Sequence, residues 1–256
     1  MMSRMQKKNR IKLISLNIEL DRHLDSVIPF LQSECPDIAC LQEVREKDTP
    51  ALEAALGMES RFVAICISDT RLADDGSLVV DEELMREGPE GITLFTALPV
   101  RASRTDYYRG EKDRVPCWSE GPRGVLLSAT FEKMGVSYTV GTTHFTWTPD
   151  GEADEAQRRD ARALLELLAQ FPDLALCGDF NAPRGREIWR MFASRYSDNI
   201  PSEYQSSLDP ALHRAGHLQR MVDGLFTSPH YRARHVRLQC GLSDHCAVVA
   251  EVARVS

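Results

Sequence analysis

Short apolar segments with the character of β-strands alternate with helical segments along almost the whole chain. Three examples are Ile11–Asn17, Asp37–Gln42 and Gly124–Phe131, while Asp154–Ala169 repeats apolar residues at the spacing of one helix face. Further strands are expected at Arg61–Ile67, Gly91–Thr96, Tyr138–Thr143, Leu174–Cys177, Met221–Phe226 and Ala247–Val252, and further helices at Leu24–Ser33 and Pro50–Leu56. Many strands joined by both hairpins and crossovers predict an α/β protein in which helices cover two packed sheets.

Length and composition indicate one globular domain. The chain has 256 residues, of which 43% are hydrophobic, and we expect a single domain over residues 11–256 after a basic tail over residues 1–10. The tail lacks the apolar stretch of a secretory signal. No segment reaches the roughly 18 apolar residues that a membrane-spanning helix needs. The prediction is a monomer without a membrane span.

The cysteine pattern and the net charge indicate the cellular compartment and the kind of ligand that are expected for this chain. The seven cysteines are scattered, and four of them lie in apolar runs: Cys40, Cys66, Cys177 and Cys246. This pattern favours buried thiols in a reducing cytoplasm over a disulfide framework. The formal net charge of −7 argues against attachment to polyanions by bulk charge, but it is compatible with an enzyme that handles phosphate through a local metal ion.

Two turns carry the most distinctive polar residues. A Gly-Asp-Phe-Asn turn at residues 178–181 follows one predicted strand, and a Ser-Asp-His turn at residues 243–245 precedes the last strand. Hydrolysis of a phosphate ester requires groups of this kind. It needs a carboxylate to hold Mg²⁺, a base to orient water, and donors for the phosphoryl oxygens.

Four further motifs stand in a fixed order along the chain. They are Ser-Leu-Asn at 15–17, Leu-Gln-Glu-Val at 41–44, Thr-Thr-His-Phe at 142–145 and Val-Asp at 222–223. Together with the two turns, they resemble the endonuclease/exonuclease/phosphatase superfamily over nearly the whole chain. The resemblance implies a four-layer α/β/β/α sandwich of two packed mixed sheets flanked by helices, with the motifs at one end. It also implies Mg²⁺- or Mn²⁺-dependent hydrolysis of phosphate esters.

The resemblance assigns a set of metal ligands. Glu43 is expected to be the main ligand, and Asp244 a second carboxylate near the ion. Asn17 is expected to orient the cluster, and Glu19 stands where many relatives carry an Asp. These side chains offer the hard oxygen atoms that Mg²⁺ prefers.

Catalytic roles are implied in the same way. His245 resembles the catalytic imidazole, and Asp223 the carboxylate that holds its other nitrogen. Asp179 is expected to orient or deprotonate the attacking water, and either Asp179 or His245 accepts the proton. Asn181 and His144 are expected to donate to the non-bridging phosphoryl oxygens.

Residues 101–123 mix cations with aromatic side chains. Arg109, Lys112, Arg114 and Trp118 are the candidates in this segment for gripping a phosphate backbone and stacking a base. The alternative is a long hairpin connection whose aromatic residues cover the core. The acidic segment 69–90 is expected to be a solvated surface loop.

The predicted activity is hydrolysis of phosphodiester bonds by in-line attack of water, with nucleic acid as the favoured substrate. A second reading is a phosphatase or phosphodiesterase for a small-molecule or lipid-derived phosphate. A third is a binding module that has lost its chemistry, which the intact motif residues disfavour. The segment 198–216 is predicted to loop over the rim of the site, where His213 is a candidate for touching substrate.

Overall fold

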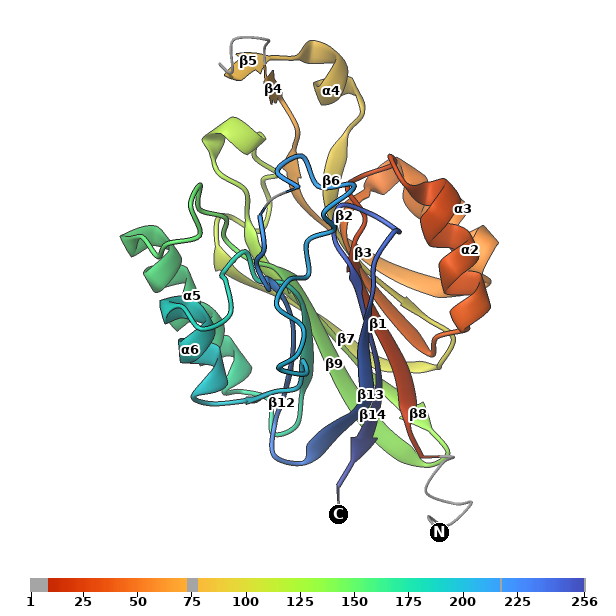
Figure 1. Cartoon of the computed structure of the whole chain (residues 1–256). Helices are drawn as coiled ribbons and strands as arrows, with labels where there is room; N and C mark the ends of the chain where they lie inside the picture. Colours follow the sequence, from red (N-terminus) through yellow and green to blue (C-terminus); the bar gives the residue numbers. More distant parts are fainter. Residues whose placement is uncertain (1–8, 73–77, 217, 256) are drawn as a thin grey trace.

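The computed structural model describes residues 9–72, 78–216 and 218–255, and within them two six-stranded sheets pack face to face (Figure 1). In spatial order, the first sheet contains β13 (Tyr231–Gln239), β14 (Ala247–Arg254), β1 (Ile11–Asn17), β2 (Ile38–Arg45), β6 (Pro89–Thr96) and β3 (Glu59–Ile67). The second contains β11 (Ser197–Asp198), β12 (Asp223–Thr227), β10 (Ala175–Asp179), β9 (Val136–His144), β8 (Gly124–Lys133) and β7 (Val100–Arg109). Residues 1–8 of the expected basic tail lie outside the described residues.

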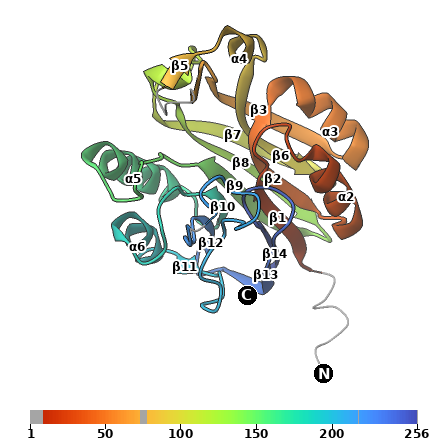
Figure 2. The ribbon, with the colours of Figure 1, turned by 45° about the horizontal axis from the view of Figure 1, so that its top comes forward.

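Helices cover the outer face of each sheet (Figures 1 and 2). Helices α2 (Leu24–Glu34) and α3 (Thr49–Leu56) lie on the first sheet, and α5 (Glu155–Leu168) and α6 (Glu187–Ala193) lie on the second. The four layers confirm the predicted α/β/β/α sandwich with two mixed sheets. None of the helices in the described residues is long and apolar enough to cross a membrane.

The first strand shows why the layers form. Leu13 lies in the large core that the two sheets share, whereas Ile14 and Leu16 lie in a second core with Val27 and Leu31 of α2. Successive side chains of a strand point to opposite faces, so a strand with large apolar residues on both faces must be covered on both sides. The sequence of β1 therefore requires a sheet on one face and helices on the other.

Helix α5 follows its sequence signals closely. The carboxylate of Asp154 accepts a hydrogen bond from the backbone N–H of Gln157 at 2.6 Å, which caps the first turn. Ala161, Leu164 and Leu168 are fully buried against the second sheet, as their helical spacing predicts. The predicted and observed helices differ by one residue at each end.

Residues 101–123 are only partly a loop. The first part of this segment forms strand β7, which is hydrogen-bonded along β8 from Val100 to Arg109. Its polar composition conceals the strand, because β7 lies at the edge of the sheet and exposes one face to solvent. The same reason explains why the arginine-rich β13, at the edge of the other sheet, was not expected.

The acidic segment 69–90 is more ordered than a surface loop. It contains the hairpin of β4 (Thr70–Leu72) and β5 (Leu78–Val80), the short helix α4 (Glu82–Arg86) and the start of β6. Asp69 is 6% exposed and accepts a hydrogen bond from the backbone N–H of Ser119 at 3.1 Å. The expectation of a fully solvated loop was therefore wrong, because this segment packs against residues 117–120.

Gly178 is required by a close approach of two backbones. It has φ of +142°, and a Cβ atom there would lie 2.0 Å from the carbonyl oxygen of Thr143 in the neighbouring strand β9. Gly135 also has positive φ, +76°, but has open space around it. Alanine substitution at the two positions therefore distinguishes the loss of stability caused by a steric clash from the loss caused by positive φ alone.

We expect Gly178→Ala to lower the free energy of unfolding by at least about 3 kcal/mol, through both clash and strained φ. Gly135→Ala should cost about 1–2 kcal/mol, through φ alone. Urea unfolding followed by circular dichroism measures both values. Equal losses in the two variants would show that β9 yields to the added methyl group.

Candidate active site

Four strand ends bring the motif residues together. Strands β1 and β2 are parallel neighbours in the first sheet, and β9 and β10 are parallel neighbours in the second. Asn17 ends β1, and Glu43 lies near the end of β2. His144 and Asp179 end β9 and β10, where they are paired with each other in register. Because the two sheets pack face to face, the four side chains meet at one end of the sandwich, away from both termini (Figure 1).

The carboxylate of Asp179 is the centre of the site. Its Oδ2 accepts a hydrogen bond from Nδ2 of Asn17 at 3.2 Å and lies 3.5 Å from Nε2 of His144. Nε2 of His245 lies 3.8 Å from the same oxygen, and the backbone N–H of Asn181 donates to Oδ1 at 2.8 Å. Asp179 is 1% exposed, so these groups take the place of the water that an ionised carboxylate requires.

Asp223 orients the ring of His245. Oδ2 of Asp223 lies 2.8 Å from Nδ1 of His245, which leaves Nε2 facing Asp179. Burial opposes a charged ring, but the carboxylates of Asp223 and Asp179 outweigh it and raise the pKa of His245 well above its ordinary value. The backbone N–H of Asp223 is held in turn by Oγ of Ser207 at 3.0 Å. Asp223 therefore fixes the orientation of the imidazole, and Ser207 fixes the position of Asp223.

Glu43 occupies a strained backbone position. Its φ is +54°, in the left-handed region that non-glycine residues rarely adopt. The cause is a β-bulge: between the partners of Thr93 and Gly91 in β6, strand β2 contains one additional residue. The bulge lies at the motif, and there Oε1 of Glu43 accepts a hydrogen bond from Nδ2 of Asn17 at 2.9 Å.

Burial disfavours the ionised forms of Glu43 and Asp244, and the nearby imidazoles of His144 and His245 offset this only in part. Burial raises the pKa of Glu43, and the nearby charge of Asp244 adds to this effect. Burial also raises the pKa of Asp244, whose Oδ1 accepts from Oγ of Ser243 at 3.1 Å. Two partly buried carboxylates whose ionised forms are disfavoured fit a divalent cation with a preference for oxygen ligands, because the ion would stabilise both charges.

Glu19 uses both of its carboxylate oxygens locally. Oε1 accepts from Nη1 of Arg22 at 2.8 Å, and Oε2 lies 2.9 Å from Nε2 of His23. The backbone N–H of Glu19 donates to Oδ1 of Asn17 at 3.1 Å. In this structure Glu19 therefore fixes Asn17, and ligation of an ion would require it to leave two partners.

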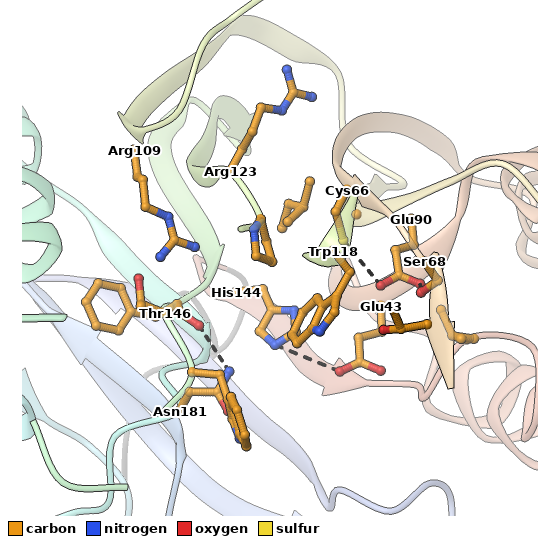
Figure 3. Close-up of a pocket in the computed structure, with 17 residues that line it drawn as sticks. Glu43, Cys66, Ser68, Glu90, Arg109, Trp118, Arg123, His144, Thr146 and Asn181 are labelled. Atoms are coloured by element: carbon orange, nitrogen blue, oxygen red, sulfur yellow. Dashed lines mark hydrogen bonds and ion pairs between the residues drawn. The ribbon is translucent and has the colours of Figure 1, made fainter. Parts of the chain in front are cut away.

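A cavity of about 400 Å³ opens beside these groups (Figure 3). Glu43, His144 and Asn181 line it together with Arg109 and Trp118, two of the residues expected to contact substrate. Nδ2 of Asn181 donates to a backbone carbonyl at 3.0 Å, which holds the amide at the edge of the cavity. The cavity thus joins the catalytic motifs to part of the segment 101–123.

The structure does not bring Lys112 and Arg114 to this cavity. Lys112 lines a separate hollow with Tyr107, and its carbonyl oxygen accepts from Nη1 of Arg123 at 2.8 Å. Arg114 pairs with Glu120 on the surface. The four expected residues are close in sequence, but only Arg109, at the end of β7, and Trp118 line the cavity.

Sequence reasoning missed two residues of the cavity wall and placed a third correctly near the site. Trp147 and Glu90 both line the cavity. Trp147 stands three positions after His144, so the motif itself pointed to it, whereas Glu90 was hidden in an acidic segment. The ring of His213 lies 6.5 Å from that of His245, so the loop that carries it does reach the rim of the site.

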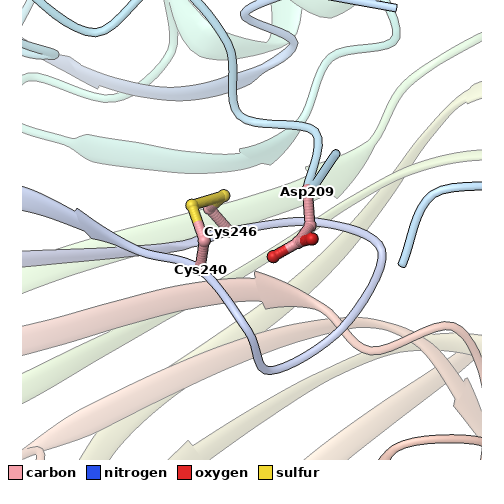
Figure 4. A group of neighbouring side chains, drawn as sticks. All are labelled: Asp209, Cys240 and Cys246. Carbon is pink, nitrogen blue, oxygen red and sulfur yellow. A yellow bond between two sulfur atoms is a disulfide. The ribbon is translucent and has the colours of Figure 1, made fainter. Parts of the chain in front are cut away.

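A disulfide closes the loop that carries Asp244 and His245 (Figure 4). The ends of β13 and β14 place the Cα atoms of Cys240 and Cys246 4.2 Å apart, and their sulfur atoms are bonded. The expectation of a free buried thiol at Cys246 was therefore wrong, because hairpin pairing joins it to an exposed cysteine nearby in sequence. The other three named cysteines are free and buried. Asp209 accepts from the backbone N–H of Gly241 at 2.7 Å and further anchors this loop.

Comparison with protein families supports this geometry. The Endonuclease/Exonuclease/phosphatase family matches residues 14–245, so the chain belongs to that family. The match begins within β1 and ends at the histidine of the last motif, and it therefore spans every candidate site residue described above. A comparison with curated proteins finds no match.

Solved structures share the fold at low sequence identity. A family protein from Bacteroides vulgatus is 18% identical with a TM-score of 0.69, covering 97% of this chain and 100% of its own. The human Nocturnin catalytic domain with bound sulfate is 19% identical with a TM-score of 0.68, covering 96% and 94%. A mannosyl-6-phosphatase from Bacteroides thetaiotaomicron is 14% identical with a TM-score of 0.63, covering 95% and 99%. These likenesses establish the fold alone.

If Asp223 acts only through the ring of His245, the two residues form one functional unit. We expect Asp223→Asn and His245→Ala each to lower kcat by at least about 100-fold, and the double variant to stay within about three-fold of His245→Ala. Asp173→Asn is the matched control, since Asp173 pairs with the exposed His230 elsewhere on the surface. Losses that multiply in the double variant would show that the two residues act independently.

Proposed function

We propose that the protein is a Mg²⁺- or Mn²⁺-dependent phosphoesterase that hydrolyses a phosphodiester by in-line attack of water. The observation that carries this proposal is the buried carboxylate of Asp179 flanked by His144 and His245, with the carboxylate of Glu43 3.8 Å from Nε2 of His144. A proton acceptor, hydrogen-bond donors and an anionic ligand thus surround one point, which is the requirement for attack on a phosphoryl group.

Each residue has a proposed role that follows from its position in the site. Oδ2 of Asp179 and Nε2 of His245 are 3.8 Å apart, so one water molecule can contact both. Asp179 accepts its proton, because the raised pKa of His245 favours the protonated ring. Asp223 keeps the ring of His245 aimed at that water. Asn181 and His144 face the same cavity and donate to the non-bridging oxygens of the phosphoryl group.

Glu43 and Asp244 are the carboxylates that would hold the metal ion. Asn17 fixes Glu43 through a hydrogen bond of 2.9 Å, and Glu19 fixes Asn17 in turn. When bound, a divalent ion supplies positive charge to the phosphoryl oxygens as negative charge develops on them.

Nucleic acid is the proposed source of the phosphodiester. Arg109 and Trp118 line the cavity beside the catalytic groups, and they offer a cation for phosphate and a flat ring for a base. Lys112 and Arg114 would meet only a strand that extends beyond the cavity. The fold is shared with a mannosyl-6-phosphatase, so the cavity and not the fold supports the choice of substrate. The monomeric state and cytoplasmic location remain predictions from sequence.

Glu43→Gln tests the metal-dependent mechanism. We expect it to lower kcat by at least about 100-fold, the scale of losing one electrostatic catalytic group, while the circular dichroism spectrum stays unchanged. EDTA should abolish hydrolysis, and added Mg²⁺ or Mn²⁺ should restore it. Glu132→Gln, which removes an exposed carboxylate paired with Arg101, is the control and should leave kcat unchanged. Full activity in the presence of chelator would rule out the proposed mechanism.

A further inference from the structure

The cavity beside Glu43 is bounded and small. Its volume is about 400 Å³, within the range of about 300–1,000 Å³ that holds one small ligand. Ile65 and Cys66 of β3 form part of its wall and are 5% and 1% exposed, so the cavity ends against the core of the protein. A space of this size accepts one ring-bearing unit of a substrate and excludes a nucleic-acid duplex.

Two tryptophans of the cavity wall remain open to solvent. Trp118 is 37% exposed and begins the short 3-10 helix η2 (Trp118–Glu120), whereas Trp147 is 48% exposed and lies in no helix or strand. Both belong to the small set of large apolar side chains that the described residues leave exposed. Exposed aromatic faces beside a reaction centre offer stacking surface to a planar ring.

The polar groups of the cavity are separated by charge. In Figure 3, Arg109 lies on one side of His144, and Ser68 and Glu90 lie on the other. Nη1 of Arg109 donates to the buried Asp160 at 3.1 Å, which holds the guanidinium in place. Oε2 of Glu90 accepts from Oγ of Ser68 at 2.9 Å. The Glu90 side therefore favours hydroxyl or amino donors and repels a second phosphate.

The wall between these charges selects the kind of ring. Trp118, Trp147, Ile65 and Pro122 present apolar surface. A nucleobase has two apolar faces and polar groups only at its edge, which matches such a wall. A hexose offers a smaller apolar face than a nucleobase, and its hydroxyl groups need hydrogen-bond partners that Trp118, Trp147 and Pro122 do not supply.

Other features argue against continuous tracking of a polynucleotide. Four arginines of segment 101–123 already form intramolecular ion pairs, namely Arg101 with Glu132, Arg104 with Asp106, Arg109 with Asp160 and Arg114 with Glu120. The chain also carries a net charge of −7. A protein that follows a phosphate backbone by charge needs a series of cations that are available to the phosphates.

We propose that the cavity binds a single nucleoside unit at the end of the substrate, with its base against Trp118 and Trp147 and its hydroxyl or amino donors directed toward Glu90. The inference rests on the phosphoesterase function proposed above. According to this inference, the enzyme acts on short nucleotide esters or on the ends of nucleic-acid strands. Glu90 and Trp147 become the residues that set specificity.

Binding without turnover tests this inference. The chain has three tryptophans, and Trp189 is buried, so emission changes report on Trp118 and Trp147. The full-length protein is titrated in EDTA with adenosine 5′-monophosphate, ribose 5-phosphate and mannose 6-phosphate. The nucleotide should bind at least about ten-fold more tightly than either sugar phosphate, the scale of one stacked base. The ratio of dissociation constants is the readout, because loss of metal weakens the phosphate contact equally in all three ligands.

Variants assign the preference to the cavity. Trp118→Ala should bring the ratio between nucleotide and ribose 5-phosphate close to one, with Trp147 as the remaining reporter. Glu90→Gln should weaken nucleotide binding by about five-fold or more, as expected for a lost hydrogen bond to a charged group. Met134→Ala and Glu132→Gln alter exposed residues outside the cavity and should keep the ratio. Equal affinity for nucleotide and ribose 5-phosphate, tighter binding of mannose 6-phosphate, or an unchanged ratio in Trp118→Ala would overturn the inference.

A parallel assay separates this inference from the proposed function. Hydrolysis of bis(p-nitrophenyl) phosphate with Mg²⁺ or Mn²⁺ tests only the phosphoesterase chemistry. If this hydrolysis occurs but the nucleotide preference is absent, the function stands and the cavity inference falls. If the preference is present but no phosphodiester is cleaved under any metal condition, the binding site stands and the proposed function falls.

Discussion

Hydrogen bonds across the interface between the two sheets hold the catalytic end of this protein together. Nδ2 of Asn17 in the first sheet bonds to Asp179 in the second at 3.2 Å, and Nε2 of the fully buried Gln42 bonds to Oγ1 of Thr142 at 3.1 Å. Apolar packing sets the distance between the two sheets but constrains their relative orientation only weakly. Buried polar groups constrain this orientation more strongly, because they need particular hydrogen-bond partners. These two contacts therefore set how the motif residues of one sheet face those of the other, and Glu43 and His144 meet as a consequence.

Several residues at the site have an unfavourable backbone conformation or an unfavourable electrostatic environment. Glu19, Leu20, Glu43 and Asn181 all have positive φ, and they account for four of the seven non-glycine residues with that conformation in the described part of the chain. Burial also disfavours the ionised form of Glu43. Strained backbone and buried charge persist only where the surrounding fold imposes them, and their concentration at one end is typical of a functional centre. A bound cation would relieve part of this cost.

The choice of substrate depends more on the loops and edge strands beside the cavity than on the layered core. Segment 101–123 looked like one basic and aromatic surface, but its first part is an edge strand and only Arg109 and Trp118 of the four expected residues reach the cavity. Ion pairs use several of the remaining cations. What is left beside the catalytic groups is a small, charge-polarised cavity with two exposed tryptophans, which suits a single unit of substrate better than a long strand.

The sequence by itself determined the layers and the family resemblance, and it indicated the candidate catalytic groups. The apolar residues on both faces of β1, the helical spacing in α5 and the polar residues at strand ends are local patterns, which depend only on residues near one another in the sequence. Tertiary structure alone decided the disulfide between Cys240 and Cys246 and the separation of Lys112 from Trp118. These depend on which chain segments meet in space and on the direction of each side chain there, and neither is encoded in spacing along the chain.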